Sequence, residues 1–199
     1  MPEEINLKAI ERKAWASYFE DGLLDILIGA MLLIGGIRSI TDYSWYTLLI
    51  LPLILILPLG KMLITIPRLG HVKFGPARNL KQTKVIAVLT ISVIATFALL
   101  MLPKSGFALP AKMLISPIMA GWIVVIFGII AYYLDFTRLF AYGLLFAISE
   151  VLSGLFGGYI GAMAQSISGI AVLLIGLFVL ARFLRKYPRP VEATSDVKA

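Results

Sequence analysis

Three acidic residues lie within or beside long apolar stretches of this sequence, where a carboxylate is costly. Glu150 is the most deeply placed, because it is the only charged residue between Arg138 and Arg182. Asp21 and Asp25 lie four residues apart at the start of the first apolar stretch. Acids in such surroundings bind or relay protons and cations, or form hydrogen bonds between helices. These three residues are the first candidates for a functional site.

The elements that must position these acids are membrane-spanning helices. The chain has 199 residues, of which 60% are hydrophobic and only 15% charged, and its mean hydropathy is +0.94. About 20 apolar residues cross a bilayer, and in lipid their backbone must form its own hydrogen bonds. We therefore predict an all-α fold, a single membrane domain with six transmembrane helices. Its spans cover about 20–37, 43–66, 85–102, 113–134, 139–158 and 163–183.

Glycines and prolines interrupt the apolar sequence at two places and predict a reversal and a kink there. The run after Glu150 is too long for one helix, so a reversal is predicted in its glycine cluster, which consists of Gly154, Gly157, Gly158 and Gly161. Such small residues also let helices approach closely, within one chain or between two copies. In the second span, prolines 52 and 58 predict a kink, and Lys61 is expected to extend to the nearby interface.

The ends of the chain are polar. Residues 2–19 carry an amphipathic pattern, which predicts an interfacial helix or, alternatively, a helical extension of the first span. Their charges argue against a cleaved signal peptide. Residues 187–199 are expected to form a flexible tail. Only Arg38, Lys104 and Lys112 of the 18 basic residues fall on one side of the predicted spans, so the positive-inside rule places both termini in the cytoplasm.

Glu150 is predicted to lie near the bilayer midplane. It follows the start of its span by 11 residues, which corresponds to about 17 Å at 1.5 Å per residue, in a core about 30 Å thick. Ser149 and Ser153 are its polar neighbours in sequence. The functional interpretation is a proton or cation site. The structural alternative is a neutral acid that forms a hydrogen bond between helices.

Asp25 is expected about one turn below the interface, as an acid that reaches water. Asp21 precedes it by one turn, and Gly29 follows on the same face. The segment Phe19-x-x-Gly22-Leu23-Leu24 is echoed by Phe140-x-x-Gly143-Leu144-Leu145, either as a weak internal repeat or by chance. If the repeat holds, Asp25 and Glu150 differ in depth by one turn and would line one cytoplasm-facing cavity.

A basic loop follows the second span and contains no acidic residue. Its Arg68, His71, Lys73 and Arg78 suit the headgroups of anionic lipids, although the positive-inside bias alone would also place basic residues there. The loop carries Pro-Arg-x-Gly-x-Val-x-Phe from residue 67 to 74. In this motif the chain resembles uncharacterised small prokaryotic multi-pass membrane proteins. The resemblance covers one loop and implies a prokaryotic cell membrane, but no activity, cofactor or site residue.

Composition argues against most enzyme and metal sites. There is no cysteine, and the single histidine lies in the basic loop, so neither a thiolate nucleophile nor a usual zinc site is expected. No cofactor or nucleic-acid partner is expected, and the sequence favours a protein that is not an enzyme. Two functions remain open. The first is a transporter- or channel-like protein that uses Glu150, and the second is a non-catalytic subunit, scaffold or assembly factor that binds lipid, a partner helix or a second copy.

Overall fold

Helices that run alongside one another make up the described part of the chain. The structure is a computed structural model that describes residues 19–41, 44–69, 76–101 and 112–188. No strand occurs in these residues, so the all-helical class expected from the sequence is confirmed for them. The predicted interfacial helix at residues 2–19 lies, apart from its last residue, outside the described residues. The tail beyond residue 188 lies outside them as well.

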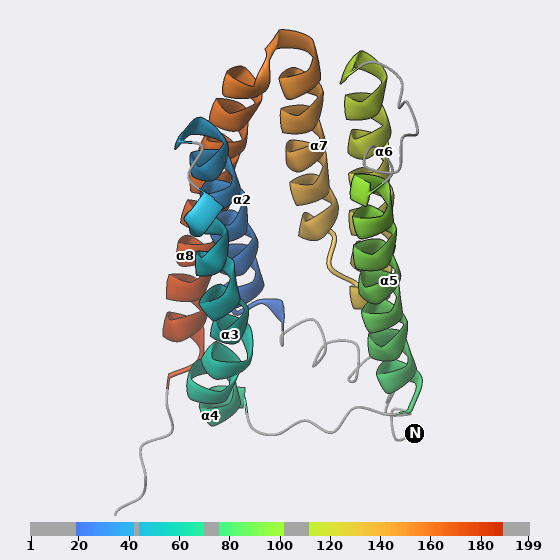
Figure 1. The fold of residues 1–199 in the computed structure, drawn as a ribbon. Coiled ribbons are helices and arrows are strands. Elements are labelled where there is room, and N and C mark those ends of the chain that lie inside the picture. The colour runs from blue at the N-terminus through green and yellow to red at the C-terminus, as the bar shows by residue number, and fades with distance from the viewer. Residues whose placement is uncertain (1–18, 42–43, 70–75, 102–111, 189–199) are drawn as a thin grey trace, which may run out of the picture.

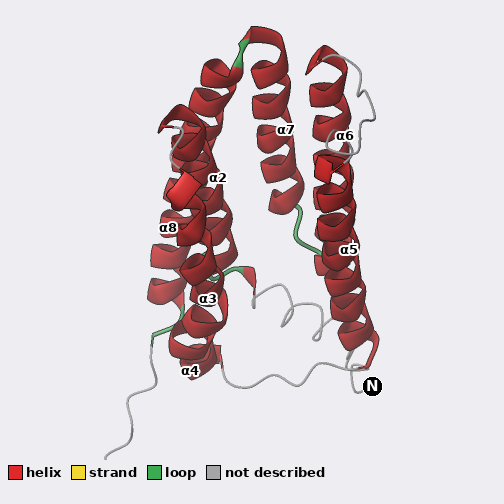
Figure 2. Ribbon diagram, viewed as in Figure 1, coloured by secondary structure: helices red, strands yellow, loops and turns green. Residues whose placement is uncertain are grey.

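The helices follow one another in an up-and-down order. After α2 (Leu23–Thr41) come the 3-10 helix η1 (Ser44–Leu49), α3 (Ile50–Gly60), the π-helix η2 (Lys61–Thr65) and α4 (Ile66–Leu69). The remaining helices are α5 (Pro76–Met101), α6 (Lys112–Leu134), α7 (Arg138–Phe156) and α8 (Gly158–Lys186). The helices α2, α3 and α8 form one side of the bundle, α5 and α6 form the other, and α7 stands between them (Figure 1). Short loops and turns join the helices where the connection is described (Figure 2).

Four described helices are long and apolar enough to cross a membrane: α2, the Ser116–Leu134 part of α6, α7 and α8. The outward surface is apolar as well. On α5 the side chains of Ile86, Ile91, Val93 and Ile94 are each more than 60% exposed. Contiguous apolar exposure on this scale is costly in water and costs nothing in lipid. The chain therefore has the character of an integral membrane protein.

The reversal predicted after Glu150 lies at Gly157. This residue separates α7 from α8, and its φ of 100° falls in the left-handed region that residues with a side chain rarely adopt. The glycine lets two apolar helices turn back on each other without a polar loop. The long uncharged run is thus divided into two antiparallel helices.

Glycines also let α2 and α8 approach each other backbone to backbone. Residues 22, 29 and 36 of the chain are glycines seven apart, and Gly169 and Gly176 of α8 repeat the same spacing. A Cβ on Gly29 would lie 2.5 Å from the backbone nitrogen of Leu173, and one on Gly169 would lie 2.5 Å from that of Leu33. A seven-residue repeat keeps the glycines on one face of each helix, so the two backbones touch.

We expect Gly29→Ala to destabilise the protein by about 1–3 kcal/mol, because the added methyl meets the Leu173 backbone, which cannot rotate aside. The matched control is Gly121→Ala in α6, where a Cβ meets nothing within 4 Å. The control should be neutral or slightly stabilising, since alanine favours helix. Thermal unfolding midpoints in detergent test this. Equal midpoints for the two variants would contradict the close α2–α8 contact.

Candidate functional site

Asp21 is a fully buried carboxylate that joins the start of α2 to the π-helix η2. Its Oδ1 accepts a hydrogen bond from the backbone N–H of Leu23 at 3.1 Å, which satisfies a donor that the first turn of α2 leaves free. Its Oδ2 accepts one from Lys61 Nζ at 2.8 Å and one from Thr65 Oγ1 at 2.7 Å. Asp21 is 0% exposed, so this arrangement replaces water with a cation and a hydroxyl.

The position of Lys61 corrects the sequence prediction. The side chain does not extend to the interface, because it turns inward to Asp21 and is only 7% exposed. The ammonium group also lies 5.0 Å from the centroid of the Phe19 ring. Both Lys61 and Thr65 belong to the π-helical turn η2, which follows the end of α3 three residues after Pro58. Such turns are frequent at functional sites.

Asp25 is also 0% exposed, which contradicts the expectation of an acid that reaches water. Its Oδ2 accepts a hydrogen bond from Arg138 Nη1 at 2.7 Å, and its Oδ1 accepts one from Tyr142 Oη at 2.8 Å. Both partners lie on α7, one turn apart. The prediction was wrong because the cation that neutralises Asp25 is Arg138, which lies 113 residues away in sequence. The residues around Asp25 do not indicate that Arg138 lies close to it.

The two aspartates therefore connect α2 to two different neighbours. Although they lie one turn apart, Asp21 bonds to η2 and Asp25 bonds to α7. Each carboxylate is held by one cation and one hydroxyl group, which is how intramembrane acids are usually accommodated. In the described residues, no group of three or more Asp, Glu and His side chains is gathered as a metal site would require. These hydrogen bonds and ion pairs join three helical segments, namely α2, η2 and α7.

Glu150 lies in a different environment, between α7 and α6. Ser116 Oγ of α6 donates to the backbone carbonyl oxygen of Glu150 at 3.0 Å and lies 3.4 Å from its Oε1. The Glu150 side chain is only partly buried, and none of the ion pairs of the described residues includes it. Ser116 was not singled out by the sequence analysis. The signal that could have found it is a hydroxyl residue in an otherwise apolar span.

The structure does not place the predicted serines on the Glu150 carboxylate. Ser149 is buried and donates to the carbonyl oxygen of Leu145 at 2.9 Å. Ser153 is where α8 packs closest to α7, because a Cβ on Gly161 would meet it. Among the hydrogen bonds of the described residues, neither serine joins the Glu150 side chain.

Asp25 and Glu150 do not line one cavity in this structure. Asp25 contacts the first two turns of α7, and Glu150 lies eight residues beyond Tyr142, or about 12 Å along the helix. The Asp25 contacts face α2, whereas Glu150 contacts α6. The two acids thus belong to separate sites at different depths.

Of the four residues predicted to bind lipid headgroups, the structure describes the side chain of Arg68 alone. Its Nη1 donates to the Ile64 carbonyl oxygen at 3.0 Å, and its Nε is buried without a hydrogen-bond partner in the described residues. His71 and Lys73 lie outside the described residues, and Arg78 belongs to the first turn of α5, where side chains are not described. The headgroup hypothesis for this loop stays a prediction.

The role of these sites rests on geometry, because no protein-family model, curated protein or solved structure matches this chain. The two aspartates and Glu150 differ in their partners. Asp21 and Asp25 are closed off by their cationic partners. Glu150 is only partly buried and has a serine as its neighbour.

Arg138→Gln should cost about 3–5 kcal/mol of stability, because it leaves the fully buried Asp25 carboxylate without a cation. Asp25→Asn should cost less, since the Arg138 side chain is 36% exposed and can be hydrated. The matched control is Lys81→Gln, which breaks a partly exposed ion pair with Asp135 and should cost less than about 1 kcal/mol.

A double-mutant cycle in detergent measures this coupling. Combining Arg138→Gln with Asp25→Asn should recover part of the stability that Arg138→Gln alone removes. If Arg138→Gln proves no more costly than Lys81→Gln, the buried pair does not hold α2 against α7.

Proposed function

We propose that this chain is a six-span protein of a prokaryotic cell membrane, with both termini in the cytoplasm. Four of the spans are the long apolar helices already described. The other two are the continuous segment from η1 to α4, about 42 Å long, and the helix α5, about 39 Å long, at about 1.5 Å per residue and about 2.0 Å per residue in the 3-10 helix. The starts of α2 and α5 and the ends of α4 and α8 lie toward one end of the bundle (Figure 1), as six alternating spans require. The distribution of basic residues supports the cytoplasm on that side.

Labelling of single cysteines tests this orientation in a chain that has no natural cysteine. We expect Lys104→Cys to react with a membrane-impermeant maleimide on intact cells, because residue 104 falls in a predicted outward loop. Lys73→Cys should react only after the cells are opened. The reverse pattern would exclude the proposed orientation.

Within this frame we propose that the protein is transporter- or channel-like and uses Glu150 as its proton or cation site. The observation that carries the proposal is the contrast among the three acids. Asp21 and Asp25 are each bound to a cation, which leaves them unavailable to a substrate ion. Glu150 is partly exposed inside a span and is bonded to Ser116. Glu150 has no cationic partner among the described residues, and an acid inside a span is costly, so a functional role is the default hypothesis for it.

A second function is favoured by the same Ser116–Glu150 contact. A protonated Glu150 can act as a hydrogen-bonding link between α6 and α7, and the glycine faces of α2 and α8 pack backbone to backbone. Under this alternative the protein is a non-catalytic subunit, scaffold or assembly factor. It would bind lipid, a partner helix or a second copy through its apolar outer surface.

Glu150→Gln distinguishes the two functions, because it keeps the size and the polar contact but removes the titrating group. In proteoliposomes loaded with the pH-sensitive dye pyranine, the transport function predicts proton movement after a pH jump or a sodium gradient. Glu150→Gln should slow that movement at least about tenfold, as expected when an essential proton-transfer group is lost.

The matched control is Ser116→Ala, which keeps the acid and removes the link to α6. It should retain proton movement while stability falls by about 0.6 kcal/mol, a typical value for a hydrogen bond between membrane helices. Unchanged flux in Glu150→Gln, or no flux in the unaltered protein, would favour the scaffold.

A further inference from the structure

A pocket of about 300 Å³ opens at the end of the bundle where α2 and α7 begin and α8 ends. Its basic residues come from two elements: Arg138 from the first turn of α7, and Arg182 and Lys186 from the last turns of α8. Glu20, just before α2, lines it too. This volume is at the lower limit of small-ligand sites, which usually measure about 300–1,000 Å³. It suits a compact group.

The charge of the pocket is positive, with three cations against one lining carboxylate. Glu20 lies 3.7 Å from Lys186 Nζ in a loose, exposed pair. Asp25, buried behind the pocket, holds one nitrogen of Arg138. No carboxylate in the described residues pairs with Arg182. The surplus of cations is what an anionic group requires.

Arg138 is held in position before any ligand arrives. Its Nη1 is bonded to Asp25, and its guanidinium carbon lies 4.9 Å from the centroid of the Phe136 ring. Phe136 is itself 6% exposed, and its N–H donates to the Ala131 carbonyl oxygen at 3.0 Å in the turn before α7. A guanidinium has five N–H donors, so the Asp25 bond leaves others to face the pocket. Such pre-positioning lowers the cost of binding.

The rest of the lining is apolar and reaches the outer surface. Phe183 is 2% exposed, whereas Phe178, five residues earlier on α8, is 70% exposed. Tyr187 ends the helix, with its ring 5.1 Å from Lys186 Nζ. A polar pocket that continues into an apolar outer face fits an amphiphile with a charged head.

We propose that this pocket binds a phosphate group, carried by the headgroup of an anionic membrane lipid. Basic pockets between helices at the cytoplasmic end are typical of such sites. Positive-inside bias and the helix dipole alone would explain basic residues at the end of α8. They do not explain why Arg138, which Asp25 holds at the start of α7, lines the same opening as Arg182 and Lys186 of α8.

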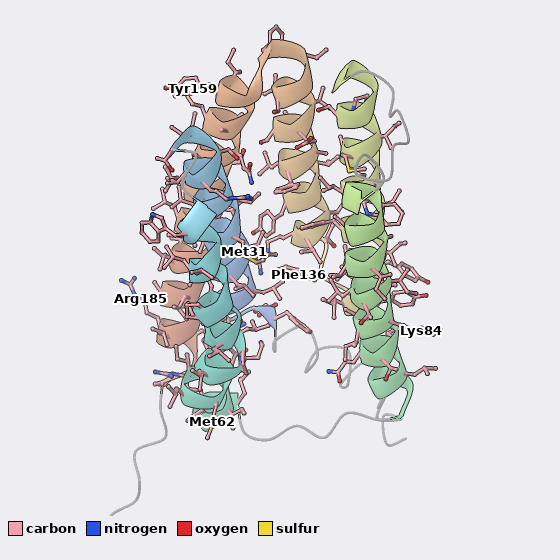
Figure 3. The ribbon with its side chains drawn as sticks, in the orientation of Figure 1. Met31, Met62, Lys84, Phe136, Tyr159 and Arg185 are labelled. Carbon is pink, nitrogen blue, oxygen red and sulfur yellow. The ribbon has the colours of Figure 1, made fainter. Side chains whose placement is uncertain are left out.

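The test compares two arginines of the same helix. Arg182 lines the pocket, whereas Arg185 does not line it and points away from the bundle (Figure 3). Both are exposed, so Arg182→Gln and Arg185→Gln should fold alike. Native mass spectrometry measures binding of dioleoyl phosphatidylglycerol, with dioleoyl phosphatidylcholine as the zwitterionic comparison, at a salt concentration that screens exposed charges.

We expect Arg182→Gln and, independently, Lys186→Gln to weaken phosphatidylglycerol binding by about fivefold or more, which corresponds to one basic contact near a membrane surface. Arg185→Gln should change it less than about twofold. Glycerol 1-phosphate and inorganic phosphate should not displace the lipid.

Displacement by either soluble anion, with the same dependence on Arg182, would support the phosphate site and assign it a soluble ligand. Equal weakening by Arg182→Gln and Arg185→Gln would overturn the proposal, because general surface charge would then explain the binding. No preference for phosphatidylglycerol over phosphatidylcholine would overturn it as well.

Discussion

Two carboxylates are buried at the start of α2, and their need for partners determines how α2 packs. Asp21 and Asp25 are both 0% exposed, and a charge withdrawn from water needs a partner of opposite charge nearby. One partner comes from η2 and the other from α7. The positions of η2 and α7 are therefore both coupled to the start of α2.

The ion pairs Lys61–Asp21 and Arg138–Asp25 determine how α2 packs against its neighbours more than they add to the free energy of folding. Desolvation offsets much of the attraction within a buried ion pair, but a mispaired buried carboxylate would be strongly disfavoured. The close glycine contact works in the same direction. The backbone of α8 meets that of α2 at Gly29 and Gly169, and only one register brings the small faces together. Charge pairing and backbone contact thus favour the same packing of α2.

The sequence predicted the parts of the structure that depend on local composition. Apolar runs marked the helices, and the glycine cluster marked the reversal at Gly157. It could not predict the partners of Asp21 and Asp25, because these lie 40 and 113 residues away. Lys61 was expected to extend outward, since nothing near it in sequence reveals a buried acid. Arg138 could have indicated a buried acid. The helix dipole disfavours a cation at a helix start, so an arginine there suggests an acidic partner.

The same reasoning separates Glu150 from the two aspartates. Its position within a long apolar helix was predicted from the sequence, and its depth in a bilayer stays a prediction. Its neighbour Ser116 is contributed by α6 and lies 34 residues away. Asp21 and Asp25 each pair with a cation, whereas none of the ion pairs of the described residues includes Glu150. The phosphate pocket adds an independent site at the end of the bundle, built partly from Arg138, the cation that holds Asp25.

An experimental structure in lipid, at a resolution that reveals ordered water, would show directly what surrounds Asp25 and Glu150. We expect Asp25 to be bonded to Arg138, and density for water or a cation to lie beside the Glu150 carboxyl group. A Glu150 side chain packed dry against Ser116, with no density for water or an ion beside it, would contradict the claim that this acid is the working site.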